Sequence, residues 1–273
     1  MAPAPLLFGI LNITADSFSD GGRYLDSQAA IAHAHDLMAQ GAAVIDVGAA
    51  SSHPDAAHVG AAAEIARLAR IVPPLRAAGI PISVDSFEPD VQLWALGQGV
   101  DYLNDIQGFP DPQIYPALAS ASAKLIVMHG VQGRGRAVRC DVPADDIWDR
   151  IFRFFDARLD ALDTAGIARE RLILDPGMGF FLGTDPAVSL AVLADIGRLE
   201  ARYDLPVLVS VSRKSFLRAL TGRDPAASAA ATLAAELFAA RAGAGYIRTH
   251  APAAITDALT VWARLAPATG INR

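Results

Sequence analysis

Two cationic segments lie in the last quarter of the chain, and each directly follows an apolar run. The first is Ser212-Arg213-Lys214-Ser215-Phe216, which combines two cations with two hydroxyl groups. The second is Arg248-Thr249-His250. An arginine forks onto phosphate oxygens, and a neighbouring histidine adds a further donor. Together the two segments predict a binding site for an anionic, phosphorylated small molecule.

Two carboxylates and one amide also stand at the ends of apolar runs. Asp85, Asn104 and Asp175 directly follow Val84, Leu103 and Leu174. A buried carboxylate is costly unless it is paired or bound to a ligand. This set can recognise a donor-rich heterocycle or stabilise a developing cation. A purely structural ion pair is the alternative for either aspartate.

Metal and nucleotide signals are sparse in the sequence. Asn12 ends the first apolar run, and its neutral oxygen would bind Mg²⁺ weakly, with a substrate pyrophosphate supplying the other ligands. The chain has neither a G-x-x-x-x-G-K-[ST] loop nor a strand-anchored G-x-G-x-x-G, which disfavours ATP and dinucleotides. His33 and His35 lie in a helical run and are interpreted as surface residues rather than a zinc pair.

Eight short apolar runs without polar alternation are spaced along the chain. Such runs are typical of parallel strands buried on both faces. The predicted strands are Leu6–Leu11, Ala43–Val47, Ile82–Val84, Tyr102–Leu103, Leu125–Met128, Leu172–Leu174, Val207–Val211 and Gly245–Ile247.

Helical patterns fill the intervals between these runs. Ser27 is a predicted N-cap, Gly41 a predicted stop, and Pro89 a predicted first-turn residue. Apolar residues also recur at helical spacing over 147–162. The expected helices with both ends assigned are Gln28–Gln40, Pro186–Arg202, Ala226–Ala242 and Pro252–Leu265.

Strands alternating with helices build either a closed barrel or an open doubly wound sheet. Polar groups follow nearly every predicted strand, and only a barrel brings all eight strand ends around one mouth. We therefore expect an α/β fold: one (β/α)8 TIM-barrel domain over residues 1–273, with its active site at the C-terminal mouth of the strands. The polar loops 12–26 and 48–60 are expected to act as active-site lids.

Composition excludes several function classes. The 273 residues carry a net charge of −6, so no overall basic field would hold nucleic acid or an anionic membrane. We see neither a basic leader nor a run of about 18 apolar residues, which disfavours a signal peptide or a membrane span. The single cysteine, Cys140, cannot form an internal disulfide, which favours a reducing, cytoplasmic location.

Six segments, taken in order, resemble the motifs of the dihydropteroate synthase family over nearly the whole chain. They are Asn12-Ile13-Thr14-Ala15-Asp16-Ser17-Phe18-Ser19-Asp20-Gly21-Gly22, Ser83-Val84-Asp85-Ser86, Asn104-Asp105-Ile106, Asp175-Pro176-Gly177-Met178-Gly179-Phe180, Ser212-Arg213-Lys214-Ser215-Phe216 and Arg248-Thr249-His250.

The resemblance implies a (β/α)8 homodimer that joins 7,8-dihydropterin pyrophosphate to p-aminobenzoate, with Mg²⁺ as cofactor and pyrophosphate as leaving group. It implies catalytic roles for Asp85, Asp175 and Lys214, and pterin contacts from these three and Asn104. Pyrophosphate would be held by Asn12, Ser52, Arg248 and His250, and Mg²⁺ by Asn12. The p-aminobenzoate pocket would comprise Phe18, Ser52, Pro54, Phe180, Phe181 and Ser212.

The chain departs from the common family pattern in two loops. Gly48-Ala49-Ala50-Ser51-Ser52-His53-Pro54 replaces the usual Gly-Glu-Ser-Thr-Arg-Pro, so His53 stands in place of an arginine. Phe180-Phe181-Leu182-Gly183 replaces Phe-Gly-Lys. Three segments resemble the Sul-type branch, whose members are insensitive to sulfonamides. They are Asn104-Asp105-Ile106-Gln107-Gly108-Phe109-Pro110-Asp111, Pro176-Gly177-Met178-Gly179-Phe180-Phe181-Leu182 and Arg248-Thr249-His250-Ala251-Pro252. This resemblance implies such insensitivity here, and we expect Phe181, as a rigid aromatic at the pocket rim, to clash with the sulfonamide tail.

Three alternative functions remain open. A pterin-binding methyltransferase barrel, moving methyl from methyltetrahydrofolate to a corrinoid, would share the aspartate and asparagine contacts but would not use a pyrophosphate clamp. A Schiff-base lyase would use Lys214, although Arg213 and a polar loop disfavour the required desolvation. A non-catalytic binding barrel would leave the polar strand ends without a role.

Overall fold

The computed structural model describes residues 4–13, 27–133, 135–224 and 227–265. Its eight strands are all parallel and form one sheet in the order β6-β5-β4-β3-β2-β1-β8-β7. The strands are β1 (Leu6–Asn12), β2 (Val44–Gly48), β3 (Ile82–Asp85), β4 (Tyr102–Asp105), β5 (Lys124–Met128), β6 (Leu172–Asp175), β7 (Leu208–Val209) and β8 (Tyr246–Thr249).

The sheet closes on itself between β6 and β7. Leu174 forms a parallel bridge with Val207, and its backbone N–H donates to the Pro206 carbonyl at 3.0 Å. Proline has no N–H, so Pro206 can only accept in this ladder. The strand predicted over Val207–Val211 is shorter in the structure, where it covers Leu208–Val209 with a bridge at Val207, and the predicted (β/α)8 barrel is confirmed.

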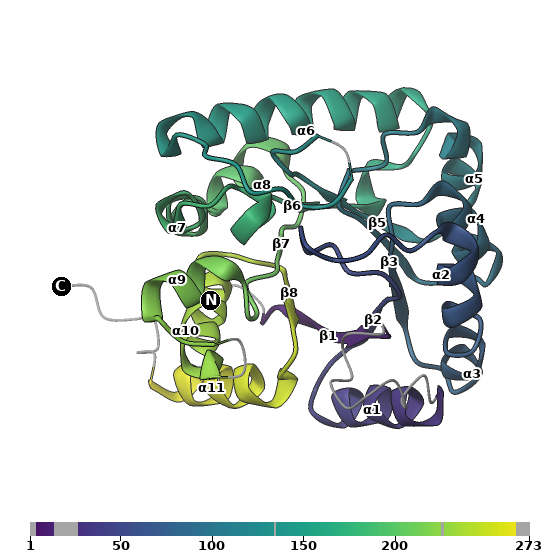
Figure 1. Cartoon of the computed structure of the whole chain (residues 1–273), viewed down its shortest axis with the longest axis horizontal. Coiled ribbons are helices and arrows are strands. Elements are labelled where there is room, and N and C mark those ends of the chain that lie inside the picture. Colours follow the sequence, from purple (N-terminus) through teal and green to yellow (C-terminus); the bar gives the residue numbers. More distant parts are fainter. Residues whose placement is uncertain (1–3, 14–26, 134, 225–226, 266–273) are drawn as a thin grey trace.

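Helices surround the strands, with α6 along the top of the view in Figure 1 and α1 and α11 at the bottom. Their bounds are α1 (Ser27–Ala39), α2 (Ala61–Leu68), α3 (Val72–Ala77), α4 (Pro89–Gly97), α5 (Tyr115–Ser120), α6 (Ile147–Thr164), α7 (Pro186–Ala194), α8 (Gly197–Tyr203), α9 (Ser215–Thr221), α10 (Ala229–Arg241) and α11 (Pro252–Leu265). None of the described helices is long and apolar enough to cross a bilayer.

Most predicted helix limits lie within one residue of the observed ones, but α10 begins at Ala229 rather than Ala226, and one predicted helix is divided in two. The predicted helix Pro252–Leu265 matches α11, and Pro89 begins α4. Gly41 follows α1 with a φ of 100°, which only glycine adopts readily. The single helix expected over Pro186–Arg202 is two helices, because Asp195 leaves the helical conformation at φ −113° and ψ 25°.

A buried apolar layer fills the barrel interior toward the amino ends of the strands. It packs the Phe8 ring edge-on against Tyr102, at 4.9 Å between centroids, and against Tyr246 at 5.8 Å. The layer comprises Phe8, Val44, Tyr102, Ile126, Ile173 and Leu208, with Tyr246 against it. Side chains alternate along a strand, so the residue two positions further on faces the same interior one layer higher. This alternation along the strands positions the side chains of the candidate site.

Candidate active site

The layer above the apolar one is mainly polar. Two residues beyond Val44, Tyr102, Ile173 and Tyr246 come Asp46, Asn104, Asp175 and Arg248. Asp85 ends β3 in register with Asn104 of β4. The strand period therefore turns four separate apolar runs into one polar interior surface.

A cavity of about 280 Å³ opens above this layer at the carboxyl ends of the strands. A second, deeper cavity of about 20 Å³ shares Asp85, Lys214 and Arg248 with it. Of the predicted site residues, the larger cavity is lined by Asn12, Ser52, Pro54, Asp85, Phe180, Phe181, Ser212, Lys214, Arg248 and His250, and the deeper one adds Asn104 and Asp175. Phe18 lies outside the described residues. The structure thus brings the other predicted residues together, and their individual roles stay predictions.

Arg248 lies between two carboxylates inside the barrel. Its Nη2 donates to Asp85 Oδ2 at 2.7 Å, and its Nε donates to Asp46 Oδ2. Asp46 is 0% exposed and Arg248 is 13% exposed. Burial alone would lower the pKa of Arg248, but Asp46 and Asp85 raise it above its usual value. Burial raises the pKa of Asp85 to about 6, against the opposing effect of Arg248.

Asp46 belongs to the candidate site through its contact with Arg248, although its position in the sequence does not predict this contact. The feature of the sequence that could have identified Asp46 is a single carboxylate inside the otherwise apolar strand Val44–Gly48. Three interior oxygens, Asp46 Oδ1, Asn104 Oδ1 and Ser210 Oγ, are buried without a hydrogen-bond partner in the described part of the chain. Buried polar atoms are normally paired, and Asn104 and Ser210 line the cavities, so their unpaired oxygens mark positions for ligand contacts.

Lys214 reaches the barrel interior because the chain turns sharply at Arg213. Arg213 has a φ of 58°, an uncommon left-handed conformation, and its N–H donates to Thr232 Oγ1 at 3.2 Å. Burial, then the charge of Arg248, lower the pKa of Lys214 to about 8. Its Nζ lies 5.0 Å from the centroid of the Phe181 ring. The site therefore holds a partly desolvated ammonium against an aromatic face.

Asp175 is fixed by the turn that follows β6. Burial raises its pKa to about 6, while the Gly177 N–H, donating to Oδ1 at 2.8 Å, acts in the opposite direction. Gly177 has a φ of 74°, and a Cβ there would lie 2.4 Å from the His129 carbonyl oxygen. His129 Nδ1 contacts the Pro176 carbonyl at 3.0 Å, and burial lowers the His129 pKa to about 4. His129 is therefore a neutral structural residue of this turn.

His250 contacts Ser212 across the last two strand ends. Its Nδ1 lies 2.9 Å from Ser212 Oγ. Burial, then the charges of Arg213 and Arg248, lower the pKa of His250 to about 3. At neutral pH the imidazole is uncharged, so it contributes hydrogen bonding rather than charge to an anion.

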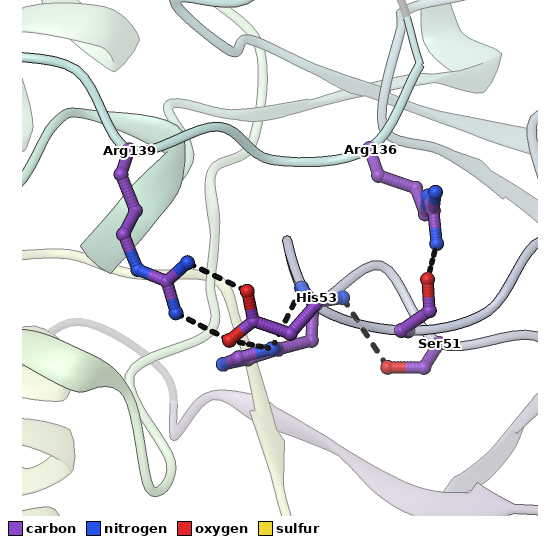
Figure 2. A network of polar contacts seen from close by, with 6 residues as sticks. Ser51, His53, Arg136 and Arg139 are labelled. Atoms are coloured by element: carbon purple, nitrogen blue, oxygen red, sulfur yellow. Dashed lines mark hydrogen bonds and ion pairs between the residues drawn. The ribbon is translucent and has the colours of Figure 1, made fainter.

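The loop after β2 is tied to the loop after β5 (Figure 2). The two terminal nitrogens of the Arg139 guanidinium, Nη1 and Nη2, donate to the Asp55 carboxylate, and Arg136 donates to the Ala56 carbonyl. The N–H of Ala137 donates to the Ser52 carbonyl at 3.2 Å. These contacts hold Ser52 at the cavity.

The two adjacent phenylalanines take different positions. Phe180 lies at the rim, with the Arg139 guanidinium 5.4 Å above its ring and the His53 ring 5.7 Å away. Phe181 is only 4% exposed and packs with Ile106, Met128 and Ala137. The expectation that Phe181 is the rim aromatic is therefore wrong, because the turn Gly179–Phe181 points the two rings in different directions.

Comparison with known proteins identifies the family. Residues 8–250 match the family described as pterin binding enzyme. The chain is 62% identical over 260 residues to the type-2 dihydropteroate synthase of Escherichia coli, covering 95% of this chain and 96% of that protein. It is 49% identical over 255 residues to the type-3 dihydropteroate synthase of Escherichia coli, covering 93% and 97%.

Solved structures agree. A Xanthomonas albilineans dihydropteroate synthase with 4-aminobenzoic acid superimposes with a TM-score of 0.87 at 37% identity, covering 97% of this chain and 94% of that one. A Yersinia pestis dihydropteroate synthase in a sulfonamide drug complex gives 0.87 at 31% identity, covering 97% and 95%. The chain belongs to the pterin-binding enzyme family.

Proposed function

We propose that the chain is a dihydropteroate synthase, a transferase that condenses 7,8-dihydropterin pyrophosphate with p-aminobenzoate to give dihydropteroate and pyrophosphate. The observation that carries this is the interior set of buried Asn104 and Asp175 with half-buried Asp85 and Lys214, which opens directly into a cavity flanked by Arg248 and His250. The relatives and solved structures described above support the same reaction.

The arrangement suits this chemistry residue by residue. Asp85 and Asp175, ionised at neutral pH, accept from ring N–H groups, and Asn104 offers an acceptor and donors. The aminobenzoate nitrogen attacks the methylene carbon of the pterin, a C–N bond forms, the C–O bond to pyrophosphate breaks, and the amine releases its proton. The carboxylates stabilise positive charge developing on the pterin, and Lys214 and Arg248 stabilise the departing anion.

A pyrophosphate-release assay with both substrates tests this function. We expect release to require both substrates and to be stoichiometric with dihydropteroate. A methyltransferase would instead consume methyltetrahydrofolate with a corrinoid and release no pyrophosphate. Such a result would replace the proposal with the methyltransferase alternative.

Mg²⁺ is the proposed cofactor, with Asn12 as its protein ligand. Asn12 Oδ1 lies beside Gly48 in the mouth, on the side of Asp85. In the described ranges no group of three or more His, Cys, Asp or Glu is placed to hold a metal ion. One neutral oxygen fits an ion that keeps its waters and takes most of its ligands from substrate phosphates. When bound, the ion would neutralise charge on the leaving group.

We further propose that the enzyme is insensitive to sulfonamides. Phe181 is held between Lys214 and the side chains of Met128 and Ala137, and it lines both cavities. A sulfonamide shares the aniline end of p-aminobenzoate but extends beyond its acidic group. Because Phe181 also lines the mouth cavity, its fixed ring limits the space there and would restrict the larger ligand more than the smaller one.

A homodimer is the proposed assembly, in a reducing cytoplasmic compartment. Large apolar side chains are exposed on the last two helices: Phe238 on α10, and Val261, Trp262 and Leu265 on α11. Exposed apolar clusters of this kind mark protein interfaces. Light scattering of the purified protein tests the dimer, and replacing Val261 and Leu265 with charged residues should yield monomers.

A further inference from the structure

Arg218 lines the mouth cavity and has no acidic partner among the described residues. It lies on α9, three residues after Ser215 and four after Lys214. At this helical spacing the three side chains lie on the same face of the helix. Its Nε is fully buried and makes no hydrogen bond within the described part of the chain. A buried donor without an acceptor is costly, so this position favours a ligand oxygen.

The other buried cations of the cavity already have carboxylate neighbours. Arg248 is bound by Asp46 and Asp85. Lys214 is close enough to Asp85 and Asp175 for both carboxylates to act on its pKa. Arg213 is exposed. Arg218 is therefore a half-buried cation whose charge remains available to an incoming anion.

The surroundings of Arg218 indicate which anion it would meet. Helix α9 packs closely against the turn Gly179–Phe181, since a Cβ on Gly179 would lie 2.9 Å from Ser215 Oγ. This packing brings the α9 wall next to Phe180, which lines the same cavity. An aromatic ring beside a free guanidinium fits an aryl carboxylate, because arginine pairs side-on with carboxylates through Nε and one terminal nitrogen.

We propose that Arg218 binds the carboxylate of p-aminobenzoate through Nε and one Nη, and thereby selects a charged aryl acid over a neutral aryl amide. The proposal rests on the dihydropteroate synthase function proposed above. It assigns the ring amine of the substrate to the Lys214 side of the cavity and the carboxylate to the Arg218 side.

The test compares p-aminobenzoate with 4-aminobenzamide, which has the same aniline but no charge, as substrates of the wild type and Arg218→Met. Methionine keeps the length of the apolar stem. We expect kcat/KM for p-aminobenzoate to fall about 10- to 100-fold, as for loss of a charge-assisted bidentate contact. We expect kcat/KM for the amide and the KM for dihydropterin pyrophosphate to change less than about threefold. Arg218→Lys, a point charge, should recover part of the loss.

Arg223→Met is the matched control, because Arg223 is exposed, lies beyond the end of α9 and does not line the cavity. It removes the same charge, and it should change neither the ratio of kcat/KM for the acid to that for the amide nor the KM for dihydropterin pyrophosphate. Equal losses with acid and amide would indicate a structural role and overturn the proposal. A selective rise in the KM for dihydropterin pyrophosphate would place Arg218 on the pyrophosphate instead. If Arg218→Met does not fold, the acid-to-amide ratio of Arg218→Lys decides the question.

The two proposals fail separately. A wild-type enzyme that releases pyrophosphate while Arg218→Met keeps its preference for the acid refutes only the Arg218 assignment. A wild type that releases no pyrophosphate refutes the proposed function, and the Arg218 assignment with it.

Discussion

The pH dependence of the enzyme follows from three titratable groups in the barrel interior. Burial raises the pKa of Asp85 and of Asp175 to about 6, and burial with Arg248 lowers the pKa of Lys214 to about 8. The proposed reaction needs both carboxylates ionised and the lysine protonated. The carboxylates ionise above pH 6, and the ammonium loses its proton above pH 8, so all three are in the active state only between these values.

The resulting profile of kcat/KM for the free enzyme should be bell-shaped, with a plateau near pH 7. At pH 9 a group with a pKa of about 8 is protonated in roughly one molecule in ten, so activity should fall about tenfold from the plateau if the ammonium is essential. At pH 5 each carboxylate is ionised to a similar one-tenth, so the acidic limb should be steeper than the basic limb because two groups act together.

Lys214→Arg isolates the basic limb. A guanidinium stays protonated throughout the range, so the variant should lose overall activity through altered geometry yet show no decline between pH 8 and pH 9. The control is Lys124→Arg, because Lys124 is the other lysine of the chain and begins β5 at the opposite end of the barrel. Any change in the protonation of the substrates with pH affects the wild type and both variants equally. An unchanged basic limb in Lys214→Arg would refute the assignment of that limb to Lys214.

Three further predictions concern the same site. Asp175→Ala and Lys214→Ala should each lower turnover by about 100-fold or more while circular dichroism and the unfolding temperature show an intact fold; near-normal activity would contradict the site assignment. Calorimetry should detect only weak Mg²⁺ binding to the substrate-free enzyme, since Asn12 is one neutral ligand, and tight binding would contradict the proposed mode. Phe181→Ala should tighten sulfonamide inhibition by up to about a hundredfold, for a relieved clash of roughly 3 kcal/mol, with little change in KM for p-aminobenzoate. Phe180→Ala shows whether loss of the neighbouring ring of the same cavity has the same effect, and an equal effect of Phe181→Ala on both ligands would remove Phe181 as the discriminator.

The sequence predicted the barrel and most of the site because both depend on local patterns. An apolar run ending in a polar residue identifies a buried parallel strand and its carboxyl end at once, as in Tyr102–Asp105 and Leu172–Asp175. Once eight such runs are known to close into a barrel, their ends must converge. This is why Asn104 and Asp175 could be assigned to one site without any knowledge of distances.

The remaining features depend on contacts between distant segments. The pairing of Arg248 with Asp46 joins residues 202 positions apart, and no local pattern links them. The same holds for the tie between Arg139 and Asp55, which spans 84 positions. Phe180 and Phe181 are identical in type and adjacent, so only the geometry of their turn decides which ring is buried. The partnerless Nε of Arg218 likewise becomes apparent only when the surrounding side chains are placed.

The distribution of charge within the site explains how one cavity can accept two anionic substrates. The inner layer holds three carboxylates, on Asp46, Asp85 and Asp175, against the cations of Lys214 and Arg248. That layer has no surplus positive charge, so it suits a neutral ring with N–H donors and disfavours a bare phosphate or carboxylate. Arg248 uses only its Nε and Nη2 on Asp46 and Asp85, which leaves further N–H donors for oxygens above the layer. We therefore expect the pyrophosphate and the aryl carboxylate to bind in the outer part of the cavity, between the strand ends and Arg218, and the pterin ring to bind in the interior.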